Sequence, residues 1–153
     1  KKKVDTRLNN TYLLLKNYNL FKMHAEEANY RDYECTLNEL EDVANSITDD
    51  KEQYFVQSIL RTKKRTKIML QHIDNCLYLY KIKCQASEKE DVQRRYKIIN
   101  LLFIEQSDKN ENYTTEQVAE ILYISTGTVS ATKKIALKEL SILLFGIDAL
   151  KFD

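Results

Sequence analysis

The sequence predicts an all-α protein in which an N-terminal part of long, coiled-coil-like helices precedes a small C-terminal domain of shorter helices. The 153 residues contain no proline and only two glycines, Gly127 and Gly146, whereas turn-rich sheets and nucleotide-binding α/β folds need more of both. Apolar residues also recur in steps of three and four, the spacing of a helix face. A hydrophobic content of 43% with 31% charged residues is typical of a globular chain.

Two helices are predicted before residue 48. The first runs from about Thr6 to His24 after a cap at Asp5 or Thr6, and its apolar face consists of Leu14, Tyr18 and Phe21. The second runs from about Tyr30 to Ile47, with acidic residues on its outer faces. Its narrow apolar seam consists of Tyr33, Leu37, Leu40, Ala44 and Ile47.

A long third helix is predicted from the capping cluster at 48–50 to about Cys84. Lys63 and Thr66 interrupt its seam, where polar residues can set the register between paired helices. Because narrow seams are typical of helices that pair, the seams at 33–47 and 70–84 predict a homodimer. The seam of the third helix consists of Val56, Ile59, Lys63, Thr66, Leu70, Ile73, Leu77, Tyr80 and Cys84.

The net charge of +1 conceals alternating blocks: +5 over residues 1–25, −8 over 26–52, +7 over 53–97 and −3 over 98–153. Such blocks can pair with one another, which consumes charge that a nucleic acid would otherwise attract. The cluster from Arg61 to Lys67 places five positive charges in seven residues. Pairing with the acidic second helix is the favoured interpretation, and tracking of phosphate is the alternative.

Several classes of protein are disfavoured by the residues present. Three cysteines do not suit a secreted disulfide framework, so we expect a reduced, cytoplasmic protein. No apolar run approaches the roughly 20 residues of a membrane span, so no membrane partner is expected. His24 and His72 lack further ligands at metal spacing, and no phosphate loop or nucleophile motif is present. We therefore expect no enzyme and no catalytic, cofactor or metal site.

The C-terminal part begins with a fourth helix. Ser87, followed three residues later by Glu90, matches the reciprocal capping pattern of a helix start. The polar run from Ser107 to Asn112 ends this helix. We expect residues 1–86 to form a helical association or interaction region and residues 87–153 to form the C-terminal domain. The apolar face of the fourth helix consists of Val92, Tyr96, Ile99 and Phe103.

A helix-turn-helix follows the polar run. Thr114 and Gln117 repeat the capping pattern and predict a short helix, with Val118, Ala119 and Leu122 on its inner side. A turn over 123–125 then leads to a longer helix that is capped by Ser125 and stopped by Gly146. Ile124 and Val129 are expected to fix the crossing of the two helices. The inner residues of the longer helix are Val129, Thr132, Ala136, Leu140 and Leu143.

The outer side of the longer helix is the candidate DNA-binding surface. Short polar side chains can bond base edges or phosphates, lysines can neutralise phosphate, and the first amides of the helix can bind an anion. An ordinary helical hairpin, or a module that docks another protein, is the alternative for the same pattern. The candidate residues are Thr126, Thr128, Ser130, Ala131, Lys133 and Lys134.

A family resemblance rests on these same residues. The stretch EQVAEILYISTGTVSATKKIALKEL, from Glu116 to Leu140, resembles region 4 of bacterial sigma factors without gaps. With the upstream YKIINLLFI, from Tyr96 to Ile104, and the polar loop, it is similar to phage late transcription regulators of the ArpU, RinA and LtrC type. Tyr123 stands where these relatives often have glycine.

The resemblance, which covers about residues 90–146, implies a function. The protein would be a transcriptional regulator, and more specifically an activator, of phage or mobile-element late genes that binds double-stranded promoter DNA and acts with RNA polymerase or another regulator. The recognition helix would be 126–140, and Thr115 would contact phosphate. A helical protein that binds another phage regulator, and not DNA, is the alternative, and a purely structural assembly protein is a third.

Overall fold

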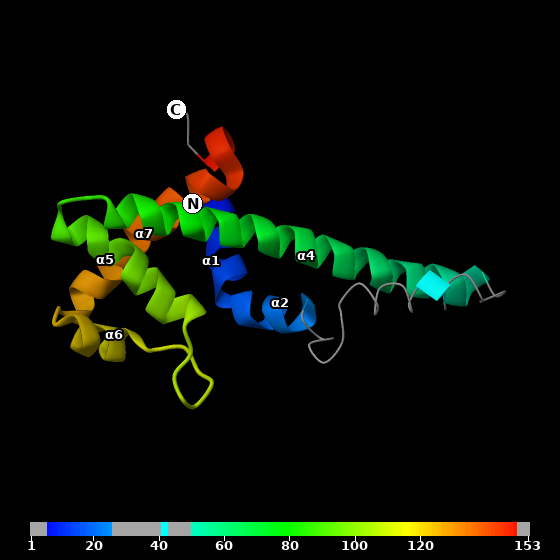
Figure 1. Ribbon diagram of the computed structural model, residues 1–153, viewed down its shortest axis with the longest axis horizontal. Helices are drawn as coiled ribbons and strands as arrows, with labels where there is room; N and C mark the ends of the chain where they lie inside the picture. Colours follow the sequence, from blue (N-terminus) through cyan, green and yellow to red (C-terminus); the bar gives the residue numbers. More distant parts are fainter. Residues whose placement is uncertain (1–5, 26–40, 43–49, 150–153) are drawn as a thin grey trace, which may run out of the picture. The chain divides into compact units, whose positions relative to one another are not determined.

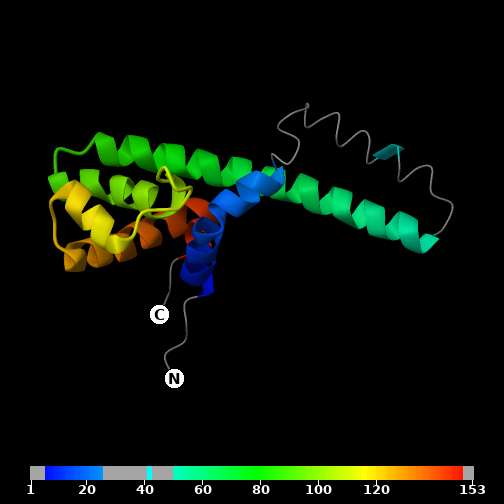
Figure 2. The same ribbon diagram turned by 90° about the horizontal axis from the view of Figure 1, so that it is seen from below.

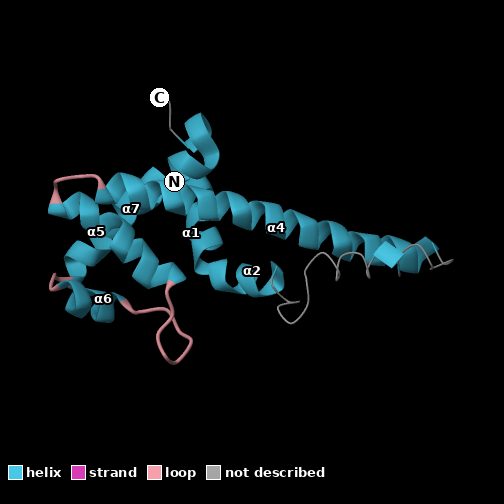
Figure 3. Cartoon of the chain, viewed as in Figure 1, coloured by secondary structure: helices cyan, strands magenta, loops and turns pink. Residues whose placement is uncertain are grey.

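The computed structural model describes residues 6–25, 41–42 and 50–149, and in these ranges the chain is helical with connecting loops (Figures 1 and 3). One isolated antiparallel bridge joins Gln106 to Asn112, and no strand occurs in the described ranges. The predicted all-α class is confirmed. The elements are α1 (Thr6–Lys16), α2 (Tyr18–Ala25), α4 (Asp50–Gln85), α5 (Glu90–Ile99), η1 (Asn100–Ile104), α6 (Thr115–Leu122), α7 (Thr126–Phe145) and η2 (Gly146–Ala149).

The chain forms two compact units. The first consists of Lys1–Asn19 and Ile73–Asp153, and the second consists of Leu20–His72. The expected boundary between residues 86 and 87 therefore falls inside the first unit. In this unit α5, α6 and α1 all pack against α7, as Figure 2 shows for α1. The sequence pattern did not reveal this division because helix α1 contacts residues more than a hundred positions away.

The predicted first helix is two helices that are interrupted at Asn17. The side-chain nitrogen of Asn17 donates a hydrogen bond of 2.9 Å to the carbonyl of Leu13. Asparagine side chains that bond nearby backbone groups compete with helical hydrogen bonds. The apolar spacing continues from α1 into α2, so periodicity alone did not reveal the break.

Helix α1 is anchored on α7 by buried hydroxyl groups. The side chains of Thr11 and Leu15 are buried, while Leu14, which was expected on the inner face, is only half-buried. Thr11 Oγ1 lies 2.7 Å from Ser141 Oγ, and the Ser141 hydroxyl donates to the carbonyl of Leu137 at 2.7 Å. The inner face of α1 is thus shifted by one residue from the predicted one.

Helix α4 confirms the predicted third helix and ends one residue beyond Cys84. The seam of its C-terminal half is buried inside a single chain, so these residues are not available to pair with a second copy. The homodimer prediction loses this part of its basis. The buried seam residues of the first unit are Ile73, Leu77, Tyr80 and Cys84.

The other seam, at 33–47, belongs to the predicted second helix, nearly all of which lies outside the described residues. Glu41 and Asp42 are described and are helical. Within the second unit, Lys64 Nζ lies 2.9 Å from a carboxylate oxygen of Glu41. One pair of the kind expected between the basic cluster and the acidic helix is therefore present.

The start of α5 differs from the predicted capping box. The helix begins at Glu90, and its cap residue, Lys89, makes no side-chain capping bond. Ser87 lies two residues before this cap. Its hydroxyl accepts from the backbone N–H of Lys89 at 3.2 Å, and its carbonyl accepts from the side chain of Gln93 at 2.7 Å. Ser87 therefore closes the connection from α4 instead of capping the helix.

One turn of π-helix, η1, extends α5 and was not predicted. It closes with a hydrogen bond of 2.7 Å from the N–H of Glu105 to the carbonyl of Asn100. The wider turn keeps Phe103 buried at the end of the helix. The carbonyl of Leu101 accepts a bond of 3.2 Å from the N–H of Tyr113. This contact ties the far end of the polar loop, just before α6, to η1.

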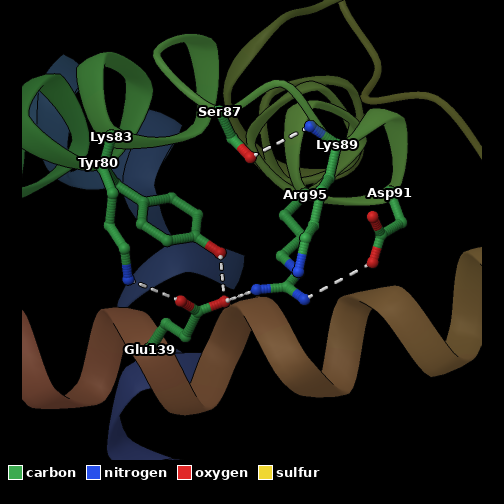
Figure 4. Close-up of polar contacts among 7 residues, drawn as sticks. All are labelled: Tyr80, Lys83, Ser87, Lys89, Asp91, Arg95 and Glu139. Atoms are coloured by element: carbon green, nitrogen blue, oxygen red, sulfur yellow. Dashed lines mark hydrogen bonds and ion pairs between the residues drawn. The ribbon is translucent and has the colours of Figure 1, made fainter.

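A polar cluster around Glu139 joins α4, α5 and α7 (Figure 4). One carboxylate oxygen accepts from Tyr80 at 3.2 Å and from Arg95 at 2.8 Å, and the other accepts from Lys83 at 2.8 Å. Burial by itself raises the pKa of Glu139, but the hydrogen bonds and charges of Lys83 and Arg95 outweigh burial and hold the pKa below the usual value of a glutamate. Burial also raises the pKa of the Tyr80 phenol.

We predict that Glu139→Gln lowers the free energy of unfolding by about 1 to 2 kcal/mol at pH 7, because two charged donors lose their anionic acceptor. A pKa that is lowered in the folded state gives stability that is present above the unfolded-state value and is lost as pH falls through the folded-state value. Urea denaturation between pH 7 and pH 3 should therefore show that the difference in free energy of unfolding between the two proteins becomes smaller as the pH falls. Glu120→Gln, at an exposed site on α6, is the control. A constant difference at all pH values would contradict the prediction.

Candidate functional site

Helix α6 begins with the predicted capping box. The N–H of Gln117 donates to Thr114 Oγ1 at 3.2 Å, and the N–H of Thr114 donates to Gln117 Oε1 at 2.9 Å. These two bonds satisfy amides that have no partner inside the helix. Val118 and Ala119 on the opposite side of the helix are buried. The sequence prediction for the start of α6 is confirmed.

The turn after α6 is set by Tyr123, whose backbone is left-handed with φ of 56° and ψ of 44°. This conformation turns the next residue back, and the N–H of Ile124 donates to the carbonyl of Ala119 at 3.0 Å. The Tyr123 side chain is 94% exposed, so its packing offers little compensation for a backbone region that favours glycine. The turn therefore depends on its neighbours on both sides.

Ser125 caps α7, as predicted. Its hydroxyl oxygen accepts from the backbone N–H of Thr128 at 3.1 Å and lies 2.8 Å from Thr128 Oγ1. The two hydroxyl groups thus already bond each other. Gly146 ends α7 with a φ of 63°. Both predicted limits of the helix are confirmed.

A small hydrophobic core holds α6 and α7 at a fixed crossing. Val118 and Val129 are fully buried in it, and Ile124 of the turn packs against it. The predicted packing of Ile124 and Val129 between the two helices is present. The core consists of Ile98, Val118, Ala119 and Val129, with Leu101, Leu102, Tyr113, Leu122 and Ile124 packed around it.

The candidate residues on α7 divide into two groups. Thr126, Ser130, Ala131 and Lys134 are exposed, whereas Thr128 and Lys133 are half-buried, as is Thr115 at the start of α6. The sequence interpretation left out Lys138, which is exposed one turn beyond Lys134. Its position four residues after Lys134 on the same helix face was the available signal.

Lys133 lies against α1. Its Nζ is 5.5 Å from the centre of the Tyr12 ring, and Nζ of Lys16 is 5.9 Å from the same centre. The Tyr12 ring in turn meets Phe103 edge-on, with 6.0 Å between ring centres. The sequence interpretation placed Lys133 with the other outer residues because nothing in the local pattern shows that α1 lies beside it.

Farther along α7 the side next to α1 is closed. Leu137 and Ser141 are buried, the latter through its bond with Thr11. Next to α1, therefore, only the N-terminal half of α7 keeps its outer side exposed in the described structure. It is also the half that follows the turn and carries most of the candidate residues.

The described residues contain no group of three His, Cys, Asp or Glu side chains that could hold a metal ion. Cys76 and Cys84 are buried, and burial raises the pKa of both thiols. A thiol that stays protonated is a poor nucleophile and a poor metal ligand.

Comparison with known protein families, with curated proteins and with solved structures gives no match to this chain. Among the described helices, none combines the length with the apolar character needed to cross a lipid bilayer.

We predict that Tyr123→Gly raises the free energy of unfolding by about 0.5 to 1 kcal/mol, because glycine adopts the left-handed backbone without steric cost. The exposed tyrosine ring gives up little packing in exchange. Thermal and urea unfolding measure the change. Tyr123→Ala, which keeps a Cβ atom, is the matched control and should show no gain, and equal stabilisation by both substitutions would contradict the explanation.

Proposed function

We propose that this protein is a DNA-binding transcriptional regulator in which α6, the turn at 123–125 and α7 act as a helix-turn-helix. In this proposal the N-terminal half of α7 is the recognition helix, and it enters the major groove of promoter DNA. The regulated genes are late genes of a phage or mobile element, and the regulator activates them together with RNA polymerase. This part of the proposal rests on the resemblance of residues 90–146 to phage late regulators.

The observation that carries the proposal is the open outer side of α7 directly after the turn. Thr126, Ser130 and Ala131 are small enough to let a helix approach base edges closely, and their exposure leaves them uncovered by the rest of the described chain. Lys134 and Lys138 flank them as phosphate ligands. The buried contact of Ile124 with Val118 and Val129 keeps this surface in a fixed orientation. The capping box of α6, the short turn and the small exposed residues at the start of α7 together support a DNA-binding role.

We predict that Lys134→Ala weakens binding to duplex DNA and lowers the slope of log K against log salt concentration by about 0.9, the value for one lost phosphate contact. Fluorescence anisotropy with a labelled late-promoter duplex, at 50 to 200 mM salt, measures the slope. A scrambled duplex of the same length should lose affinity by the same factor, because a phosphate contact carries no sequence information.

The matched control for this prediction is Lys97→Ala, an exposed lysine on α5. It removes the same charge from the first unit at a site outside the proposed surface. An unchanged slope for Lys134→Ala, or an equal fall for both variants, would remove Lys134 from the DNA-binding surface.

A second candidate function is supported by a separate observation. Ile121 is 46% exposed on the outer side of α6, beside the exposed Glu116 and Glu120, and the Tyr123 ring is almost fully exposed. In this candidate function Ile121 and Tyr123 are the apolar and aromatic residues that contact the partner protein. The chain would then act by binding another regulator, and it would form a stable heteromer while ignoring promoter duplexes.

A further inference from the structure

We propose that helix α1 takes part in the DNA-binding surface, where Lys16 and Lys133 form a two-lysine phosphate clamp around the ring of Tyr12. This inference rests on the proposed function and adds to it a contact outside the helix-turn-helix. It assigns Tyr12 as the positioning residue of the clamp and Lys16 as a phosphate ligand that is 110 residues away from α7 in sequence.

The geometry places two ammonium groups from different helices on one aromatic ring. Nζ of Lys133 lies 5.5 Å and Nζ of Lys16 lies 5.9 Å from the ring centre of Tyr12. The distance between the two nitrogens is therefore at most the sum of these two distances. The Tyr12 ring also makes a T-shaped contact with the Phe103 ring, which restrains its position. Two like charges near one ring repel each other, and an anion that lies near both of them relieves that repulsion.

The aromatic ring holds the lysines without neutralising them. A ring attracts a cation through its quadrupole, so the full positive charge remains available to a further ligand. In the described ranges of the chain, neither ammonium group lies within ion-pair distance of a carboxylate. Lys83, by contrast, is paired with Glu139, and Lys64 is paired with Glu41. Lys16 and Lys133 therefore carry charge that an external anion can bind, and they carry it beside one another on the same ring.

The clamp is continuous with the proposed recognition surface. Lys133 directly precedes Lys134, and it follows the exposed Ser130 by one helical turn. On a helix this places Lys133 at the edge of the open side and not opposite to it. Phosphates line both edges of the major groove, so a helix that inserts there brings its edges against the DNA backbone. The anion that the clamp would meet is thus a backbone phosphate of the same duplex.

Helix α1 is held firmly enough to present Lys16 in this position. The buried hydroxyl pair of Thr11 with Ser141 fixes α1 on α7 one residue before Tyr12. The side chain of Asn19 donates to the carbonyl of Phe103 at 3.2 Å, beyond the other end of α1. A phosphate ligand that is already in place loses less side-chain freedom when it binds.

The test is the salt dependence of DNA binding by three variants of the full chain. Lys16→Ala should lower the slope of log K against log salt by about 0.9, as for one phosphate contact. Tyr12→Leu removes the ring and should weaken binding several-fold, while Tyr12→Phe keeps the ring and should bind like the unchanged protein. Lys16→Arg, which keeps the charge, should retain the slope. Thermal unfolding of each variant separates a loss of fold from a loss of contact.

The matched control is Lys81→Ala. Lys81 Nζ lies 6.0 Å from the ring centre of Tyr96, so this variant removes a lysine of the same type from a ring without a second lysine in the described chain. Its slope should be unchanged. If Lys134→Ala lowers the slope and Lys16→Ala does not, the clamp is refuted and the proposed function stands. If the unchanged protein shows no salt-dependent binding to duplex DNA, the proposed function itself fails.

Discussion

The arrangement of the candidate site depends on one packing contact, that of Ile124 and Val129 with the inner side of α6. Val118 and Val129 have no exposed surface, and Ile124 reaches them from a turn whose backbone is held in a disfavoured region at Tyr123. Burial of aliphatic side chains contributes about 1.5 to 3 kcal/mol each, which exceeds the cost of about 1 to 2 kcal/mol for a left-handed non-glycine residue. The packing of the core therefore stabilises the left-handed turn at Tyr123. The turn sets the orientation of α7, and with it the side of α7 that remains exposed.

A second group of contacts fixes the rest of α7. Glu139 binds groups from α4 and α5, and Ser141 binds Thr11 of α1. These contacts lie in the C-terminal half of the helix, whereas the exposed candidate residues lie in the N-terminal half. A helix is stiff over this length. The C-terminal half, which these contacts fix, therefore holds the exposed N-terminal half in place without covering it. Because of this division, α7 is a core element over its C-terminal half and keeps the outer side of its N-terminal half exposed.

The parts of the structure that could be predicted from the sequence are those in which cause and effect lie within a few residues. The capping bonds of Thr114 and Ser125 join atoms three residues apart, and the contact of Ile124 with Val129 closes over five. The break at Asn17 lies within one continuous apolar spacing, which gives no sign of it. Local spacing also misplaced the start of α5, because Ser87 satisfies its bonding with the loop instead of the helix.

The remaining features depend on contacts between distant segments. Lys133 was placed among the outer residues because its helix position allows this, and only the arrival of α1 brings it to Tyr12. The apolar seam at 70–84 suggested a partner chain. Such a seam predicts that other residues cover it, but it does not tell whether those residues belong to the same chain or to a second one. Its residues from Ile73 onward are buried within the same chain. Periodicity identifies a face that will be buried, and tertiary structure decides what buries it.

Residues 98–153 carry a net charge of −3, but the binding of a polyanion depends on the charges that lie within contact distance of it. At physiological salt an exposed charge acts over roughly 8 to 10 Å. Glu139 is engaged by Lys83 and Arg95, so its charge is compensated within the cluster. Lys16 and Lys133 are held together on one ring, and Lys134 and Lys138 are exposed on α7. A polyanion that approached the exposed half of α7 would therefore meet these neighbouring lysines. Their local electric field would set the energy of contact, and the net charge of residues 98–153 would contribute little.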